Sequence, residues 1–210
     1  MKKLLILLFS FFLLSSTSVF AEDISDFSIE GISIGDSLLD YMTEEEILEE
    51  IERTKDWYSY LNEPSKYVHI QLDGDFSTYR MLTIFISNPT RNKYITNENE
   101  NETFIIKSID GYISFEEKFD DCIVERNEVI AVLSNMFPNV NKREVARTYE
   151  PDLSGNGIED AIVFDLKGNS TIAAICTDID ESYRLKQNWT EGLSVTITTE
   201  EINDWLSDYK

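Results

Sequence analysis

Apolar and polar residues alternate along much of the first half of the chain, and this period of two is typical of β-strands with one buried face. The alternation runs through 66–72 and 81–86, with a turn signal at 73–75 between them. It resumes in 104–115, where Gly111 indicates a bulge or bend. We therefore expect neighbouring antiparallel strands in this half of the chain.

Two longer segments instead repeat apolar residues every three or four positions, as amphipathic helices do. The first begins at Thr43, because Thr43 and Glu46 form a capping box whose acidic residues suit the positive end of the helix dipole. The second covers 116–136 and ends before Pro138. A short closing helix is expected after Thr199, which begins a similar capping pattern.

Four further strands are predicted in the second half, at 145–149, 158–166, 171–179 and 193–198. Runs of strands beside separate helices indicate an α+β fold, in which an antiparallel sheet of about six to seven strands is covered by helices on one face. The element order also leaves open a division into two tandem helix-plus-meander units, at 22–115 and 116–210.

The start of the chain has the three parts of a secretory signal peptide. Lys2 and Lys3 precede an apolar run at 4–14, and small residues at 15–21 end in a cleavage site. The apolar run is too short for a membrane-spanning helix, which needs roughly 20 residues. We therefore expect a signal peptide at 1–21, no stable membrane anchor, and a single periplasmic or secreted domain at 22–210.

The charge balance is strongly acidic. The chain has 40 acidic and 18 basic residues, and loss of Lys2 and Lys3 with the signal peptide changes its formal charge from −22 to −24. The electric field of a protein with this negative charge repels nucleic acid and anionic lipid. It favours divalent ions and a basic or cationic protein or ligand, while a solvated acidic surface for solubility is the simpler interpretation.

Cys122 and Cys176 are the two cysteines of the chain. An even number in an exported protein predicts one disulfide. The bond would join the helix at 116–136 to the strand at 171–179, and closing this loop would stabilise the fold by roughly 4 kcal/mol. Redox-active or metal-binding cysteines need a partner two residues away or further ligands, so a structural role is expected.

The loop at 152–160 is the sharpest local motif. Oxygen-bearing side chains occupy its positions 1, 3, 5 and 9, namely Asp152, Ser154, Asn156 and Asp160. With Gly157 at position 6, this is how a short loop wraps calcium. However, Val163 stands at the twelfth position, where an EF-hand has Glu, and the same residue types favour a tight turn. Calcium is the one cofactor the sequence suggests, and the turn is the interpretation we prefer.

Enzymatic chemistry has little support in the sequence. His69 is the single histidine, so any arrangement of nucleophile, histidine and acid must use it. Its alternating strand favours a half-buried sheet residue instead. Paired carboxylates of an envelope hydrolase are an alternative among 40 acidic residues, but only a pair in a cleft with different pKa values would indicate one.

Four segments carry a family resemblance: FSIEGISIGDSLLDYMTEEEI at 27–47, the helix bearing Cys122, DLSGNG at 152–157 and LSVTITTEEINDWL at 193–206. They resemble small exported proteins from AT-rich marine alphaproteobacteria, which implies export but assigns no catalytic or binding residue. The element order is also similar to helix-plus-meander domains such as the outer-membrane assembly factor BamE and the β-lactamase inhibitor protein. The lipid-attachment cysteine of BamE has no counterpart in this chain.

These patterns together favour a non-enzymatic periplasmic domain that binds a partner or ligand or supports the envelope. A calcium-binding module at 152–160 and an envelope hydrolase with paired carboxylates are the alternatives.

Overall fold

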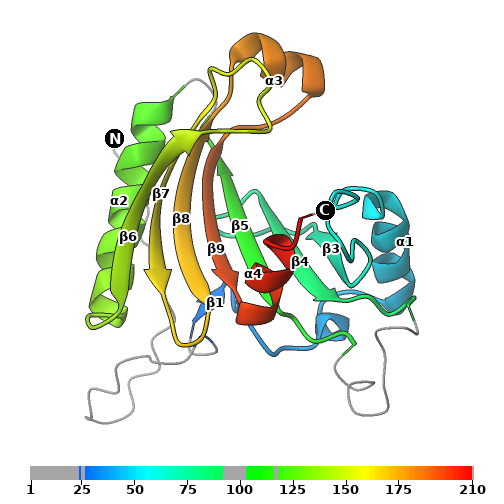
Figure 1. The fold of residues 1–210 in the computed structure, drawn as a ribbon. Coiled ribbons are helices and arrows are strands. Elements are labelled where there is room, and N and C mark those ends of the chain that lie inside the picture. The colour runs from blue at the N-terminus through cyan, green and yellow to red at the C-terminus, as the bar shows by residue number, and fades with distance from the viewer. Residues whose placement is uncertain (1–23, 25–26, 92–102, 116–117, 210) are drawn as a thin grey trace.

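The computed structural model describes residue 24 and residues 27–91, 103–115 and 118–209 (Figure 1). The expected signal peptide at 1–21 lies outside these residues. In the described part of the chain, seven strands form one sheet in the order β3-β4-β5-β9-β8-β7-β6, and all neighbouring strands are antiparallel. This confirms the expected α+β fold with an antiparallel sheet.

The strands follow the predicted alternation closely. Their bounds are β3 (Tyr67–Leu72), β4 (Met81–Ser87), β5 (Ser108–Ser114), β6 (Asn141–Thr148), β7 (Ile158–Asp165), β8 (Thr171–Asp178) and β9 (Gly192–Thr198). A small separate hairpin near the start consists of β1 (Ser28–Ile29) and β2 (Ile32–Ser33). Each half of the chain therefore supplies a meander that follows a helix, and β9 joins the two meanders between β5 and β8.

Side chains cap the N-termini of two of the described helices, α1 and α3. Their bounds are the 3-10 helix η2 (Leu38–Asp40), α1 (Glu44–Thr54), α2 (Phe119–Met136), α3 (Glu181–Gln187) and α4 (Glu200–Leu206). The capping box of α1 is present, since the Glu46 amide donates to Thr43 Oγ1 and the Thr43 amide donates to the Glu46 carboxylate at 2.8 Å. The prediction that the Thr199 side chain caps α4 is wrong. Ser170 Oγ, from the β7–β8 turn, accepts the Glu200 amide at 3.0 Å instead.

The main core lies on the face of the sheet that α1 and α2 cover. Figure 1 shows these two helices at opposite ends of the sheet. Ile47 and Ile51 of α1 pack against β3, while Leu133 of α2 packs against β8 and β9. Burial of each large aliphatic side chain contributes about 1.5–3 kcal/mol, so this layer supplies most of the stabilising contact.

The short α4 packs on the opposite face of the sheet, where no helix was expected. Trp205 lies edge-on to Tyr67 and Phe85, with ring centroids 5.3 and 5.8 Å away, and Ile202 is buried beside them. Leu61 joins this second cluster. Helices therefore contact both faces. The short α4 lies across one end of the strands, where it packs on Tyr67 and Phe85 and also bonds to Lys107 and to the β7–β8 turn.

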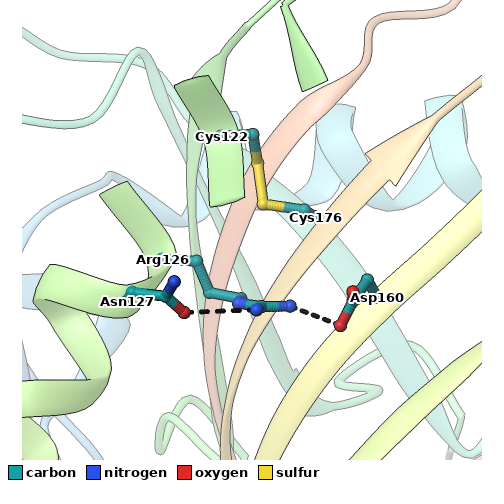
Figure 2. Close-up of a disulfide and its surroundings, with 5 residues drawn as sticks. All are labelled: Cys122, Arg126, Asn127, Asp160 and Cys176. Atoms are coloured by element: carbon teal, nitrogen blue, oxygen red, sulfur yellow. Dashed lines mark hydrogen bonds and ion pairs between the residues drawn. A yellow bond between two sulfur atoms is a disulfide. The ribbon is translucent and has the colours of Figure 1, made fainter. Parts of the chain in front are cut away.

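A disulfide links the helix layer to the sheet, as the sequence predicts. Cys122 and Cys176 are bonded with their Cα atoms 6.0 Å apart, and both are fully buried. Figure 2 shows Arg126, one helical turn further along α2, reaching toward Asp160 of β7, with which it forms an ion pair. The Arg126 guanidinium also donates to Asn127 at 3.2 Å. A covalent bond and a charge pair thus hold α2 on this face.

The structure has no bulge at Gly111, because β5 keeps its register through this residue with both β4 and β9. The need for glycine at position 111 has a steric reason instead. A Cβ atom at position 111 would lie 2.6 Å from the ring of Tyr79, which packs flat against the backbone there. The residue is glycine to make room for a ring.

Candidate binding face around Asp110

The face of the sheet opposite α2 carries a polar surface at its centre. The strand register places Thr83 of β4 beside Asp110, and Asp110 beside Thr196 of β9. Because residues paired across a sheet project from the same face, these side chains share one surface. We call this surface the Asp110 face and define it by Thr83, Asp110, Tyr112, Ser194 and Thr196.

Asp110 is the residue that makes this surface unusual. Its side chain is half-buried as a whole, but its Oδ1 atom is enclosed and accepts no hydrogen bond from the described residues. Oδ2 has one contact, with Ser194 Oγ at 3.5 Å, which is the outer limit for a hydrogen bond. An enclosed carboxylate oxygen without a donor costs free energy, so Asp110 works against the stability of the fold.

Burial raises the pKa of Asp110 to about 7, and the weak contact with Ser194 opposes this only in part. None of the ion pairs in the described part of the chain includes Asp110. The carboxyl group therefore changes its charge near neutral pH. A carboxyl group with this pKa is a candidate for function, since functional sites are where such shifts gather.

The Asp110 face has different surroundings on its two sides. Toward β6 lies a small aliphatic cluster, in which Ala173 pairs with Thr196 on one side and with Val163 on the other. Toward β3 lie the aromatic residues that α4 covers. Phe85 pairs with Ser108, two positions before Asp110, and contacts Tyr58 at 5.5 Å between ring centroids. A polar centre between aliphatic and aromatic sides can both orient a ligand and provide contact area.

His69 lies at the aromatic side, on β3, and is half-buried as expected. Its Nδ1 atom is 2.9 Å from the Tyr58 hydroxyl, and its ring lies edge-on to Trp57 and Phe85. Burial lowers the pKa of His69 to about 4, with smaller and opposing effects of Arg53 and Glu50. The imidazole is thus neutral at pH 7, and its described hydrogen bond goes to a half-buried tyrosine.

The candidate calcium residues are only partly brought together. The Asp152 carboxylate accepts the Ser154 and Asp180 amides, both at 2.9 Å, so it shapes the turn from inside the protein. Asn156 donates its side-chain amide to Asp180 at 3.0 Å. Asp160 is directed to the opposite side, where it pairs with Arg126 (Figure 2). No group of three or more His, Cys, Asp or Glu side chains in the described ranges is arranged to hold a metal ion.

Sequence patterns did not single out Asp110. An acidic residue between Ile109 and Gly111 fits the polar phase of an ordinary alternating strand, which normally faces solvent. Its enclosure depends on which strands lie beside β5, and one of the two neighbours, β9, comes from a distant part of the chain. The one available signal was an acidic residue at the centre of a short, otherwise apolar or small-residue strand (Ser108–Ser114).

Comparison of the chain with protein-family models, curated proteins and solved structures finds no match. Within the part of the chain that the structure describes, no helix has the length and apolar character to cross a bilayer. The function must therefore be argued from the Asp110 face itself.

Proposed function

We propose that the protein is a non-enzymatic binding domain of an exported compartment, and that the Asp110 face is its binding surface. The observation that carries the proposal is the enclosed Oδ1 atom of Asp110, which lacks a hydrogen-bond donor in the described structure. If Asp110 had no role beyond the fold, a neutral residue in its place would make the protein more stable. Asp110 as a whole is only half-buried, so a molecule bound on this face lies against it, and a residue kept at such a cost is a candidate for recognition.

The arrangement of the helices supports this choice of face. The long α2 and the disulfide occupy the other face of the sheet, and α4 contacts β3, β4, Lys107 and the β7–β8 turn at one end of the strands. The centre of the Asp110 face thus lies outside both helix contacts. A rigid sheet that presents polar groups on such a surface is suited to holding a partner without rearrangement.

Export is part of the proposal, and the signal sequence at 1–21 and the buried disulfide support it. N-terminal sequencing of protein recovered from outside the cytoplasm should begin at Glu22. Protein that begins at Met1 and is found in the cytoplasm with free thiols would overturn this part.

Photo-crosslinking tests the binding surface. A photoreactive phenylalanine analogue replaces either Ile175, which borders the Asp110 face, or Glu128, which is exposed on α2. Both variants are produced in cells that export the protein, and the crosslinked species are compared by mass. We expect a discrete adduct from position 175 and none of the same mass from position 128. Equal labelling from both positions, or labelling from position 128 alone, would exclude the Asp110 face as the binding surface.

A further inference from the structure

We propose that the free edge of β6 (Asn141–Thr148) binds an extended segment of a protein partner, which adds to the sheet as a further antiparallel strand. The partner segment has acidic residues where it faces Arg143 and Arg147, and a basic residue where it faces Glu144. This surface is separate from the Asp110 face, so the proposal does not depend on the proposed function. Figure 1 shows β6 at the border of the sheet, and within the described part of the chain it pairs with β7 alone.

The strand register shows which backbone groups of β6 point away from the sheet. Beyond the end of β6, the ladder with β7 continues to Tyr149, whose amide donates to the Gly157 carbonyl at 2.9 Å. In an antiparallel ladder, residues bonded to the neighbouring strand alternate with residues whose N–H and C=O groups point to the other side. The odd-numbered residues of β6 therefore bond to β7. The outward N–H and C=O groups belong to the even-numbered residues, namely Lys142, Glu144, Ala146 and Thr148.

The opposite edge of the same sheet is closed by side chains of α1. The Thr54 hydroxyl donates to the His69 carbonyl of β3 at 2.8 Å, and the Gln71 amide of β3 donates to the Glu50 carboxylate at 3.0 Å. Both bonds satisfy backbone groups that point away from β4. Among the described residues, the outward groups of β6 have no comparable backbone or side-chain partner. Because unpaired edges accept further strands, the edge that the fold leaves open is the one suited to docking.

The β6 edge is accessible to a partner. All residues of β6 are exposed except Val145, which is half-buried. The long α2 packs against β8 and β9, and a hydrogen bond from Lys142 Nζ to Ser134 Oγ, at 3.1 Å, joins it to β6. The outward backbone groups are thus open to an incoming strand.

Two arginines on one side of β6 favour an acidic partner segment. Arg143 Nε donates to Asp165 at 3.0 Å, and Arg147 Nε donates to Glu159 at 2.9 Å, both across to β7. The two arginine side chains are nevertheless 51% and 63% exposed. A guanidinium carries more N–H donors than one carboxylate uses, so each arginine can bind a second carboxylate on its outer side.

The neighbouring positions of β6 extend this match. Val145 lies between the two arginines on the same side, beside the small aliphatic cluster of β7 and β8, so an apolar residue fits opposite it. Glu144 projects to the other side and favours a basic residue opposite. Along an antiparallel strand from Arg147 to Arg143, the complementary segment therefore reads acidic, any residue, apolar, basic, acidic.

A second copy of this chain fits the β6 edge less well. If two copies of β6 paired antiparallel over their full length, Arg143 of each copy would lie opposite Arg147 of the other. Like charges directly opposite each other destabilise a strand pair. The formal charge of −22 on each chain adds repulsion at longer range. The charged side chains also reject apolar strands, so the edge selects its partner by charge.

The test uses the mature protein and two synthetic peptides. The matched peptide, acetyl-Thr-Glu-Thr-Val-Lys-Glu-Glu-amide, places glutamates opposite Arg147, Arg143 and Lys142. Its lysine lies opposite Glu144. The charge-swapped peptide replaces each glutamate by lysine and the lysine by glutamate. Loose attraction to the acidic protein favours the swapped peptide, whereas pairing with β6 favours the matched one.

Amide hydrogen exchange followed by NMR reports the pairing directly. In the free protein we expect fast exchange at the outward amides of β6 and slow exchange at the residues between them, which bond to β7. The matched peptide should slow exchange at the outward amides, and it should bind about tenfold tighter or more than the swapped peptide. Equal binding of the two peptides, tighter binding of the swapped one, or slowed exchange only outside β6 would overturn the proposal.

A variant at Ala146 isolates the backbone of β6. Ala146→Pro removes an outward N–H group without removing a bond to β7, and proline is tolerated at such an edge position. It should weaken binding of the matched peptide about tenfold or more. Ala146→Thr keeps the N–H group and should bind as the wild type does.

Circular dichroism checks that both Ala146 variants are folded, and the alternating exchange pattern of the wild type tests the proposal without any variant. Wild-type affinity of Ala146→Pro for the matched peptide would overturn the proposal. So would a dimer of the protein alone, seen by sedimentation velocity and abolished by Ala146→Pro, because it would assign the edge to a second copy.

Discussion

Replacement of Asp110 by asparagine should stabilise the protein, and the gain should depend on pH in a way that the structure specifies. Asparagine has nearly the same shape but cannot ionise, so it removes the cost of holding a charge at an enclosed position. The ordinary pKa of an aspartate is 3.8, and burial raises that of Asp110 to about 7. A difference of about three pKa units corresponds to about 4 kcal/mol at most.

The direction of this pH dependence follows from whether the folded or the unfolded chain binds the proton. Below about pH 4 the carboxyl group is protonated in both the folded and the unfolded chain, so ionisation contributes nothing to stability. Between about pH 4 and 7 the unfolded chain loses its proton while the folded chain keeps it, so the wild type loses stability as the pH rises. Above about pH 7 both states are ionised and the loss is complete.

Urea unfolding followed by circular dichroism measures this difference. We expect the free energies of unfolding of the wild type and Asp110→Asn to be similar near pH 4. The asparagine variant should become more stable by a few kcal/mol at about pH 8. A difference that stays constant with pH, or a wild type that is more stable at about pH 8, would refute an uncompensated carboxylate in the folded protein.

Other features of the fold give three further predictions. Replacing Cys122 and Cys176 by alanine should lower the free energy of unfolding by about 4 kcal/mol, because the bond closes a loop across a sequence separation of 54 residues; unchanged denaturant midpoints would contradict this. Thr43→Ala should cost about 1 kcal/mol in the same assay, since it removes the capping box of α1. Thr199→Ala should cost much less, because no hydrogen bond to the Thr199 hydroxyl is found in the described residues. Added sodium chloride at pH 7 should raise the melting temperature by screening excess negative charge, and a fall would show that attractive pairs dominate.

Features that depend on short stretches of sequence could be predicted. Alternation located β3, β4, β7, β8 and β9 to within one or two residues, and the capping box fixed the start of α1. The disulfide followed from the number of cysteines and the expected compartment. In each case the pattern lies within one element or depends on composition alone.

Features that depend on tertiary contacts could not be predicted. The β6 strand extends to Asn141–Thr148 because it pairs with β7 along its whole length, yet most of its residues are exposed and show no alternation. The short α3 was missed, because its helical residues give little apolar periodicity. It begins at Asp180, whose carboxylate accepts two amides, and ends at Asn188 in a left-handed conformation. The enclosure of Asp110 depends partly on β9, a neighbour from a distant part of the chain that local patterns do not encode.

The position of β9 has a consequence for how the chain folds. This strand is made after all the other strands of the sheet but lies at its centre, between β5 and β8. Until β9 arrives, β5 and β8 each have an edge without a partner, and such edges invite pairing with other chains. The bond between Cys122 and Cys176 lies wholly within the earlier part of the chain, so oxidation can fix α2 on β8 before the sheet closes. Completion of the sheet then requires a late, long-range insertion, which is intrinsically slow and leaves an intermediate with unpaired strand edges that is prone to aggregate.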